Sequence, residues 1–187
     1  NTLVRLPCGE ITVTKKIRED DDQDKVGNQG WNDLADFEIG QTVPYRYESN
    51  MPDVNGYNTY YYAWHDVMSE ALTFKKDSVA IRIYESSNAR NYYELKEGEF
   101  EVKEAPGGGD TFQVIVSDMK KIIDREFNRK NEAGENKYGQ KIVLTYQATL
   151  NEKAAKNTGR PGFENDVRLE FSNDPDSAVR GSTGYTP

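Results

Sequence analysis

The sequence predicts an all-β domain, built as a two-sheet immunoglobulin-like β-sandwich with one short helix. Two observations lead to this prediction. Many short segments alternate apolar and polar residues with the period of two that a half-buried strand requires, and Gly, Pro, Asn and Asp separate them. Only one segment has helical spacing. The length of 187 residues is sufficient for a single domain with a substantial core.

Nine segments are predicted as strands, because each alternates or is rich in β-branched and aromatic residues. In chain order they are residues 10–17, 41–49, 58–66, 78–86, 91–95, 99–105, 111–117, 140–151 and 165–173. Pro44 favours a sheet edge or a strand start, since proline donates no ladder hydrogen bond. The segment KEGE, residues 96–99, is expected to be a hairpin turn between the two strands that flank it.

The segment with helical spacing covers residues 117–129. Met119, Ile122, Ile123 and Phe127 recur at intervals that place them on one face of a helix. Ser117 is the expected N-cap, and Asp118 suits the first turn. We therefore predict one short amphipathic helix that packs on a sheet.

The composition excludes several classes of function. A net charge of −8, with 24 basic and 32 acidic residues, argues against a nucleic-acid-binding surface. Cys8 is the only cysteine, so it cannot form an internal disulfide. We expect no signal peptide and no membrane span, because no apolar run is long enough. No phosphate-binding loop and no nucleophile–base pair is legible, so neither a cofactor, a metal nor enzymatic turnover is expected.

Three segments could bind ligands, but each has a simpler interpretation. The acidic run DDDQD, residues 20–24, lacks the spacing of a calcium loop and is better explained as a solvated loop. The aromatic run from Tyr60 to Trp64 could stack on sugars, although core packing and a cross-strand ladder are the usual explanation. The glycine-rich PGGGD, residues 106–110, is expected to be a surface loop.

Three polar residues, Lys15, Asp66 and Asn165, are predicted on strand faces that are otherwise apolar. Their neighbours on those faces are Ile11, Val13, Ile17, Tyr62, Trp64, Val167, Leu169 and Phe171. Buried polar groups must satisfy one another, so the three are expected to meet in the interior. Two simpler alternatives stay open: Asp66 as a turn or cap residue, and Lys15 in an ordinary salt bridge with Asp66 at the sandwich rim.

Four segments in order resemble the isopeptide-forming second domain of Gram-positive backbone pilins. They are IGQTVPYRYESNMP, YYYAWHDVMSEALTF, KIVLTYQATLNEKA and NDVRLEFSN. The resemblance extends from about Thr12 to Asn173 and implies the collagen-adhesin A-type variant of the immunoglobulin fold. Residues 124–140 are longer than the matching stretch of the family, and neither a sorting motif nor a polymerising-lysine motif is visible.

The resemblance implies a covalent Lys–Asn bond between the first and last strands, assisted by an acidic residue. The lysine of the family matches Lys15 and the acid matches Asp66. The asparagine most resembles Asn165, with Asn151 as the second choice. Burial disfavours charge on both the amine and the acid, so a proton could pass from Lys15 to Asp66. The neutral amine would then attack the carboxamide while Asp66 shuttles protons as ammonia leaves, once per chain.

The expected function is that of a structural domain of an extracellular pilus or surface protein, attached to the cell wall of a Gram-positive bacterium. Its expected partners are other pilin subunits and the domains of the parent chain in a sortase-assembled fibre, with a host surface ligand as a further candidate. The alternative is an adhesin domain that binds glycan or host matrix, and a hydrolytic enzyme is least favoured. The predicted limits are a lead-in over residues 1–9, a sandwich over 10–175 and a linker over 176–187.

Overall fold

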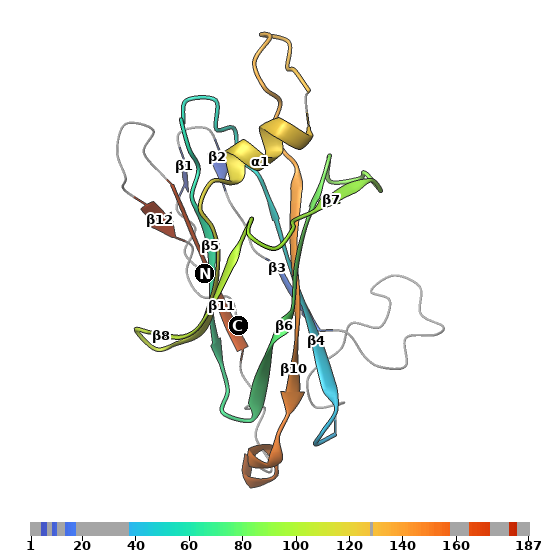
Figure 1. Cartoon of the computed structure of the whole chain (residues 1–187), viewed down its shortest axis with the longest axis vertical. Helices are drawn as coiled ribbons and strands as arrows, with labels where there is room; N and C mark the ends of the chain where they lie inside the picture. The colour runs from blue at the N-terminus through green and yellow to red at the C-terminus, as the bar shows by residue number, and fades with distance from the viewer. Residues whose placement is uncertain are drawn as a thin grey trace.

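A computed structural model describes residues 5–6, 9–10, 14–17, 38–127, 129–157, 165–172 and 180–182. Two five-stranded antiparallel sheets face one another, which confirms the predicted β-sandwich (Figure 1). The acidic run at residues 20–24 lies outside the described residues.

The first sheet has the strand order β3-β4-β10-β6-β7. Its strands are β3 (Thr14–Ile17), β4 (Thr42–Asn50), β10 (Lys141–Leu150), β6 (Leu72–Tyr84) and β7 (Tyr92–Glu94). The second sheet has the order β12-β11-β5-β9-β8. Its strands are β12 (Arg180–Ser182), β11 (Asn165–Ser172), β5 (Tyr62–Met68), β9 (Asp110–Val116) and β8 (Glu101–Gly107). A separate pair joins β1 (Arg5–Leu6) and β2 (Gly9–Glu10).

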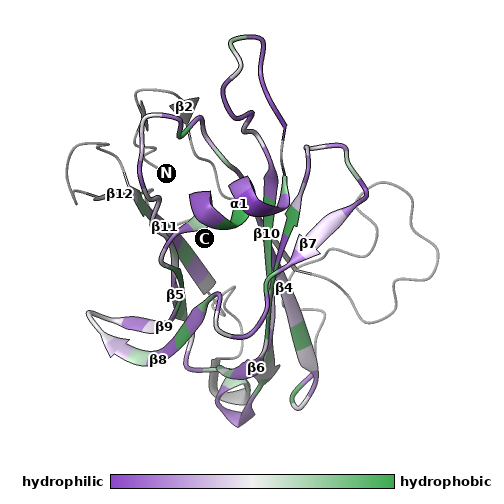
Figure 2. Cartoon of the chain, turned by 45° about the horizontal axis from the view of Figure 1, so that its top comes forward, coloured by the Kyte–Doolittle hydropathy of each residue, from purple (hydrophilic) through white to green (hydrophobic). Residues whose placement is uncertain are grey.

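The interior is filled largely by aromatic residues. Along β4 every second residue is buried, as the predicted alternation requires. Figure 2 shows hydrophobic and hydrophilic bands along several strands of the sandwich. The largest fully buried side chains include Trp64, Tyr45, Tyr47, Tyr60, Tyr62, Tyr146, Phe112 and Phe171. Burial of each such ring contributes roughly 1.5–3 kcal/mol. A core of this composition must also find hydrogen-bond partners for tyrosine hydroxyls, and Tyr62 donates to Ser49 Oγ at 2.7 Å.

Contacts across the interior show which strands face one another. Tyr47 of β4 reaches Asp66 of β5, with 2.8 Å between the hydroxyl and carboxyl oxygens. Phe74 of β6 stacks on Phe112 of β9, with ring centroids 3.8 Å apart. Since β3 lies beyond β4 in one sheet and β11 lies beyond β5 in the other, β3 and β11 occupy the same edge of the sandwich.

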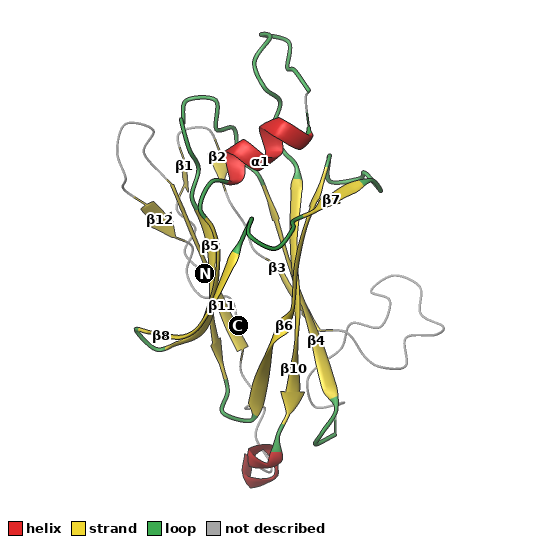
Figure 3. Ribbon diagram, in the orientation of Figure 1, coloured by secondary structure: helices red, strands yellow, loops and turns green. Residues whose placement is uncertain are grey.

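The helices close the two ends of the sandwich (Figure 3). α1 (Met119–Glu126) lies within the predicted segment and buries Met119, Ile122 and Ile123. The predicted N-cap was wrong by one residue: Asp118, not Ser117, caps the helix and accepts from the Lys121 N–H at 3.2 Å. Asp118 also accepts from the Tyr60 N–H, which links the helix start to the strand region before β5. A short 3-10 helix, η2 (Glu152–Asn157), was not predicted.

Two details of strand pairing differ from the sequence expectation. β7 pairs with β6 in the first sheet and β8 pairs with β9 in the second, so KEGE is not the turn of a hairpin between them. The turn itself exists, since the Glu99 N–H donates to the Lys96 carbonyl, but a local turn signal cannot specify which strands pair. Pro44 stands near the start of β4, directly before Tyr45, the first β4 residue that pairs with the described part of β3.

The predicted domain limits remain a prediction. β12 falls inside the stretch expected to be a linker, and it pairs with the end of β11 at the edge of the second sheet.

A polar cluster holds α1 to the turn after β7. The Arg125 guanidinium donates to Glu99 Oε2 at 2.6 Å and to the Tyr93 hydroxyl at 3.0 Å. Tyr93 in turn donates to Glu99 Oε1 at 2.5 Å. Burial alone would raise the pKa of Glu99, but the bonds from Tyr93, the Lys96 N–H and Arg125 outweigh it and lower that pKa from 4.5 to about 2.

This cluster predicts an acid-dependent loss of stability. A carboxyl whose folded pKa is depressed stabilises the protein above its unfolded pKa, and the contribution disappears as pH falls from about 4.5 to about 2. Glu99→Gln is therefore expected to be less stable than the parent chain at pH 7, and the difference should shrink over that pH window. Urea unfolding at several pH values measures this, and parallel pH curves for the two proteins would contradict it.

Candidate functional site around Asp66

Asp66 lies in the middle of the sandwich, in the central strand β5, with none of its surface exposed. Its Oδ2 lies 2.8 Å from the Tyr47 hydroxyl oxygen and 2.5 Å from the Tyr146 hydroxyl oxygen, within hydrogen-bond distance of both. The two hydroxyl oxygens are themselves 2.6 Å apart. The alternative that Asp66 is a turn or cap residue is therefore wrong, because the residue is an interior member of a strand. We call Asp66, Tyr47 and Tyr146 the Asp66 cluster.

Burial keeps the phenols of this region protonated. It is the largest cause that raises the pKa of Tyr47 and Tyr146 well above the usual value for tyrosine. Burial also raises the pKa of Tyr45, whose ring stacks on that of Tyr146 at 5.1 Å. These phenols therefore cannot serve as bases near neutral pH.

The strand register places Lys15 beside the Asp66 cluster. Lys15 is the cross-strand partner of Tyr47, and Lys16 is the partner of Arg46. Tyr47 belongs to the buried face of β4 and Arg46 to its outer face. Directly opposed residues of an antiparallel pair share a face, so the position of Lys15 belongs to the interior face of the sheet. The side chains of residues 14–17 are outside the described part of the structure.

Asn165 occupies a position on the same edge of the sandwich. It begins β11 and is the cross-strand partner of Met68, while Val167 is the partner of Asp66. Asn165 is thus diagonal to Asp66, at a spacing of roughly 7–8 Å that side chains can bridge. The side chain of Asn165 also lies outside the described residues.

Asn151 has a different location and a different role. Its carboxamide nitrogen donates to the Glu70 carbonyl at 2.8 Å and to Thr73 Oγ1 at 3.1 Å. Its carboxamide oxygen accepts from the Lys153 N–H at 2.9 Å, which caps η2. Lys15 and Leu144 both pair with Tyr47, in one row of the sheet, and Asn151 lies seven residues after Leu144, directly after the end of β10. At the rise of a β-strand this separation is about 23 Å.

The aromatic run at residues 60–64 does not form a sugar-stacking platform. Tyr60, Tyr62 and Trp64 are fully buried in the core, so this part of the adhesin alternative is wrong. Alternation alone could not establish this, because an aromatic strand can lie with either face toward solvent.

His65, next to Asp66 in sequence, faces the opposite side of the sheet and is nearly buried there. Its Nδ1 lies 2.6 Å from Asp110 Oδ2 and its Nε2 lies 2.9 Å from Glu170 Oε1. The ring therefore bridges β9, β5 and β11. From the sequence, His65 could be interpreted only as a surface or satisfied side chain rather than a ligand, because its partners lie 45 and 105 residues further along the chain.

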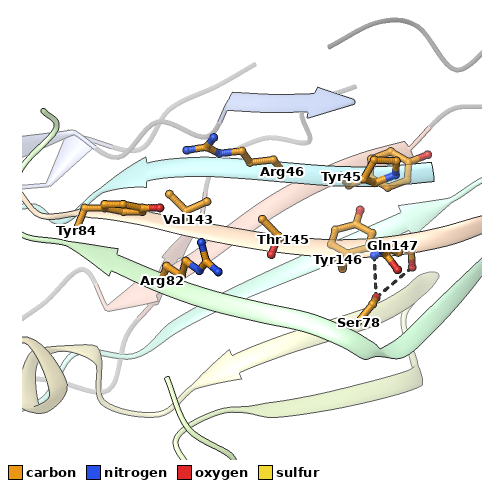
Figure 4. Close-up of a pocket in the computed structure, with 10 residues that line it drawn as sticks. Tyr45, Arg46, Ser78, Arg82, Tyr84, Val143, Thr145, Tyr146 and Gln147 are labelled. Carbon is orange, nitrogen blue, oxygen red and sulfur yellow. Dashed lines mark hydrogen bonds between the residues drawn. The ribbon is translucent and has the colours of Figure 1, made fainter. Parts of the chain in front are cut away.

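A cavity of about 310 Å³ opens on the outer face of the first sheet (Figure 4). It is lined by Pro44, Tyr45, Arg46, Ser78, Arg82, Tyr84, Val143, Thr145, Tyr146 and Gln147. It lies where the pairing of β6 with β10 shifts between Thr145 and Gln147, and the Gln147 N–H donates to Ser78 Oγ there at 2.8 Å. Its two arginines already form ion pairs with Glu48 and Glu94. No His, Cys, Asp or Glu is among the lining residues, so the cavity offers no nucleophile–base pair.

The fold and the buried cluster define an immunoglobulin-like sandwich domain, in which a buried carboxyl group of one sheet contacts two tyrosine hydroxyls of the other. Residues 39–175 match the family described as Gram-positive pilin backbone subunit 2, Cna-B-like domain, and the chain belongs to this family. It is a backbone pilin domain of a Gram-positive surface structure, as the sequence resemblance predicted. The resemblance had named the collagen-adhesin A-type variant, whereas the description of the family uses the term Cna-B-like.

Solved pilin structures share the fold. The major pilin SpaD from Corynebacterium diphtheriae is 17% identical, with a TM-score of 0.54 over 94% of this chain and 35% of that chain. The T6 backbone pilin of Streptococcus pyogenes is 20% identical, with a TM-score of 0.50 over 88% of this chain and 30% of that chain. The full-length RrgB pilus protein from Streptococcus pneumoniae is 19% identical, with a TM-score of 0.50 over 89% of this chain and 24% of that chain.

The chain thus spans about a quarter to a third of the length of these three pilins. At such identities the likeness concerns the fold alone. Comparison with the curated proteins gave no match. Among the residues that the structure describes, no helix is both long and apolar enough to cross a membrane.

The bridge made by His65 predicts a measurable contribution to stability. His65→Gln removes the group that separates Asp110 from Glu170, and leaves a nearly buried carboxyl facing a second one. We expect the free energy of unfolding to fall by about 2–3 kcal/mol in urea titration at pH 7, because two like charges then face one another without the ring that bridged them. Arg82→Gln, which breaks the exposed pair with Glu94, is the control and should cost less than about 1 kcal/mol. Equal effects of the two substitutions would contradict the prediction.

Proposed function

We propose that this domain is a structural unit of a Gram-positive pilus, stabilised by an intramolecular isopeptide bond between Lys15 and Asn165 that Asp66 helps to form. The observation that carries the proposal is the complete burial of Asp66 beside the strand position of Lys15. Burying a carboxyl group in an aromatic core costs free energy, and a buried acid next to candidate reaction partners marks a functional site.

Three observations support the assignment of Lys15, Asp66 and Asn165 to the cross-link. β3 and β11 lie at one edge of the sandwich, on opposite sheets, with Asp66 on the strand next to β11. Tyr47 is the cross-strand partner of Lys15, and its hydroxyl reaches Asp66 across the interior. Asn165 lies on a strand whose residues at 167, 169 and 171 are all buried, so its position belongs to the interior face.

Asn165 is preferred to Asn151 as the second cross-linked residue. The carboxamide of Asn151 is used by the cap of η2 and by bonds to Glu70 and Thr73. Its distance of about 23 Å from the row of Lys15 along the strand exceeds the reach of a lysine side chain.

The reaction exchanges one amide for another. Before the reaction, Lys15 and Asp66 share one proton. When Asp66 holds this proton, both groups are neutral: Lys15 is an amine and Asp66 is a carboxylic acid. The amine nitrogen forms a bond to the carboxamide carbon of Asn165, and the bond from that carbon to Nδ2 breaks. One proton moves from the attacking nitrogen, by way of Asp66, to the leaving nitrogen, which departs as ammonia. Fixed proximity supplies much of the acceleration, since effective molarities of about 10⁵ M or more are attainable.

The bond would close a loop of about 150 residues and tie the two sheets together at one edge. By the chain-entropy argument such a loop stabilises the fold by roughly 5 kcal/mol. Unlike a disulfide, it cannot be reduced, which suits a cell-surface fibre. The partners are then other pilin subunits and domains of the parent chain, assembled by sortase and attached to the cell wall through parts of that chain. A host ligand is not required by this role.

Intact-mass spectrometry tests the cross-link. The purified domain is expected to be lighter than its sequence by one ammonia, and a peptide that joins residues 15 and 165 should appear after proteolysis. Lys15→Ala, Asn165→Ala and Asp66→Ala should each restore the full mass. Each should also lower the free energy of unfolding by several kcal/mol, because the loop is no longer closed.

Asn151→Ala is the matched control and should keep the mass deficit. A parent chain of full mass would refute the cross-link, and a full-mass Asn151→Ala variant would move the bond from Asn165 to Asn151.

A further inference from the structure

Three oxygen atoms of the Asp66 cluster lie at the corners of a small triangle. The Tyr47 hydroxyl is 2.8 Å from Asp66 Oδ2, the Tyr146 hydroxyl is 2.5 Å from the same Oδ2, and the two hydroxyls are 2.6 Å apart. All three separations are those of O–H···O hydrogen bonds, and each such bond needs a proton between its two oxygens. All three residues are buried almost completely.

The number of protons decides the charge of Asp66. Each phenol brings one proton, and an ionised carboxyl brings none. With Asp66 ionised, two protons must serve three contacts, and one pair of oxygens is left in close contact with no proton between them. With Asp66 protonated at Oδ2, every oxygen donates once and accepts once around the ring. The third proton cannot be borrowed from an altered phenol, since burial raises the pKa of both tyrosines.

We propose that Tyr47 and Tyr146 are positioning residues that hold Asp66 as a neutral carboxylic acid in a ring of three hydrogen bonds. Their role in the cross-linking reaction rests on the proposed isopeptide bond; the neutral ring stands on the geometry alone.

The neutral acid explains how Lys15 becomes reactive. A carboxylate close to a lysine favours the ammonium form, which is not a nucleophile. By stabilising the protonated carboxyl, the ring shifts the shared proton away from the amine and toward Asp66. The ring also fixes the orientation of the carboxyl group, since Oδ2 is held by both tyrosines while proton exchange with the reacting groups falls to Oδ1.

Infrared spectroscopy of the folded domain tests the ring. Carboxylic acids absorb at a higher frequency than carboxylates, and isotope-labelled aspartate identifies an aspartic acid band without any substitution. The parent chain is expected to show this band at neutral pH, and Tyr47→Phe and Tyr146→Phe should shift or remove it. Tyr62→Phe is the matched control, because Tyr62 is equally buried and its hydroxyl bonds Ser49 instead. If the parent chain lacks the aspartic acid band, the ring of hydrogen bonds is wrong, whether or not the chain has lost ammonia.

The rate of cross-linking tests the positioning role. Newly synthesised chains can be chased in a cell-free translation system and assayed by mass for the loss of ammonia. We expect Tyr47→Phe and Tyr146→Phe to form the bond about ten-fold or more slowly than Tyr62→Phe. Equal rates in all three would overturn the positioning role and leave the cross-link standing. A parent chain that never loses ammonia would refute the proposed function, while the infrared band would still decide the ring.

Discussion

The interior of this domain is organised by one constraint, the burial of a carboxyl group among aromatic rings. Asp66 has no exposed surface, and its oxygen is held by tyrosines from two strands of the opposite sheet. These contacts join β4 and β10 to β5 across the core, so the relative placement of the sheets is tied to the position of one acid. Aliphatic side chains could fill the same space, but they would supply no hydrogen bond between the two sheets.

The core relies on aromatic rings in a chain in which 35% of the residues are hydrophobic, tyrosine included. Tyrosine supplies a large apolar surface, and its hydroxyl allows polar groups to be satisfied inside. The same rings carry the candidate chemistry. Tyr47 packs in the core, reaches Asp66, and is the cross-strand partner of Lys15, so stability and the proposed reaction depend on the same side chain.

The fold was predictable because alternation is a local property. The strands at 41–49, 140–151 and 165–173, and the helix near 117–129, were recognised from their own residues. Pairing was less accessible, since the KEGE turn gives no sign that β7 and β8 belong to different sheets. For the candidate site, alternation selected Asp66 as an inward residue. It could not find Tyr146, which is 80 residues away, or the carboxylates of Asp110 and Glu170 around His65. Such partners are defined by packing between distant segments.

The edge position of β3 has a mechanical consequence. Within the described part of the chain, Thr14–Ile17 pair with β4 and with no second strand. A ladder with one neighbouring strand can be peeled from its end one residue pair after another, so its resistance is that of a single pair at a time. Fastening such a strand to the opposite sheet at Lys15 would stop the peeling at that residue, and the load would then pass into both sheets at once.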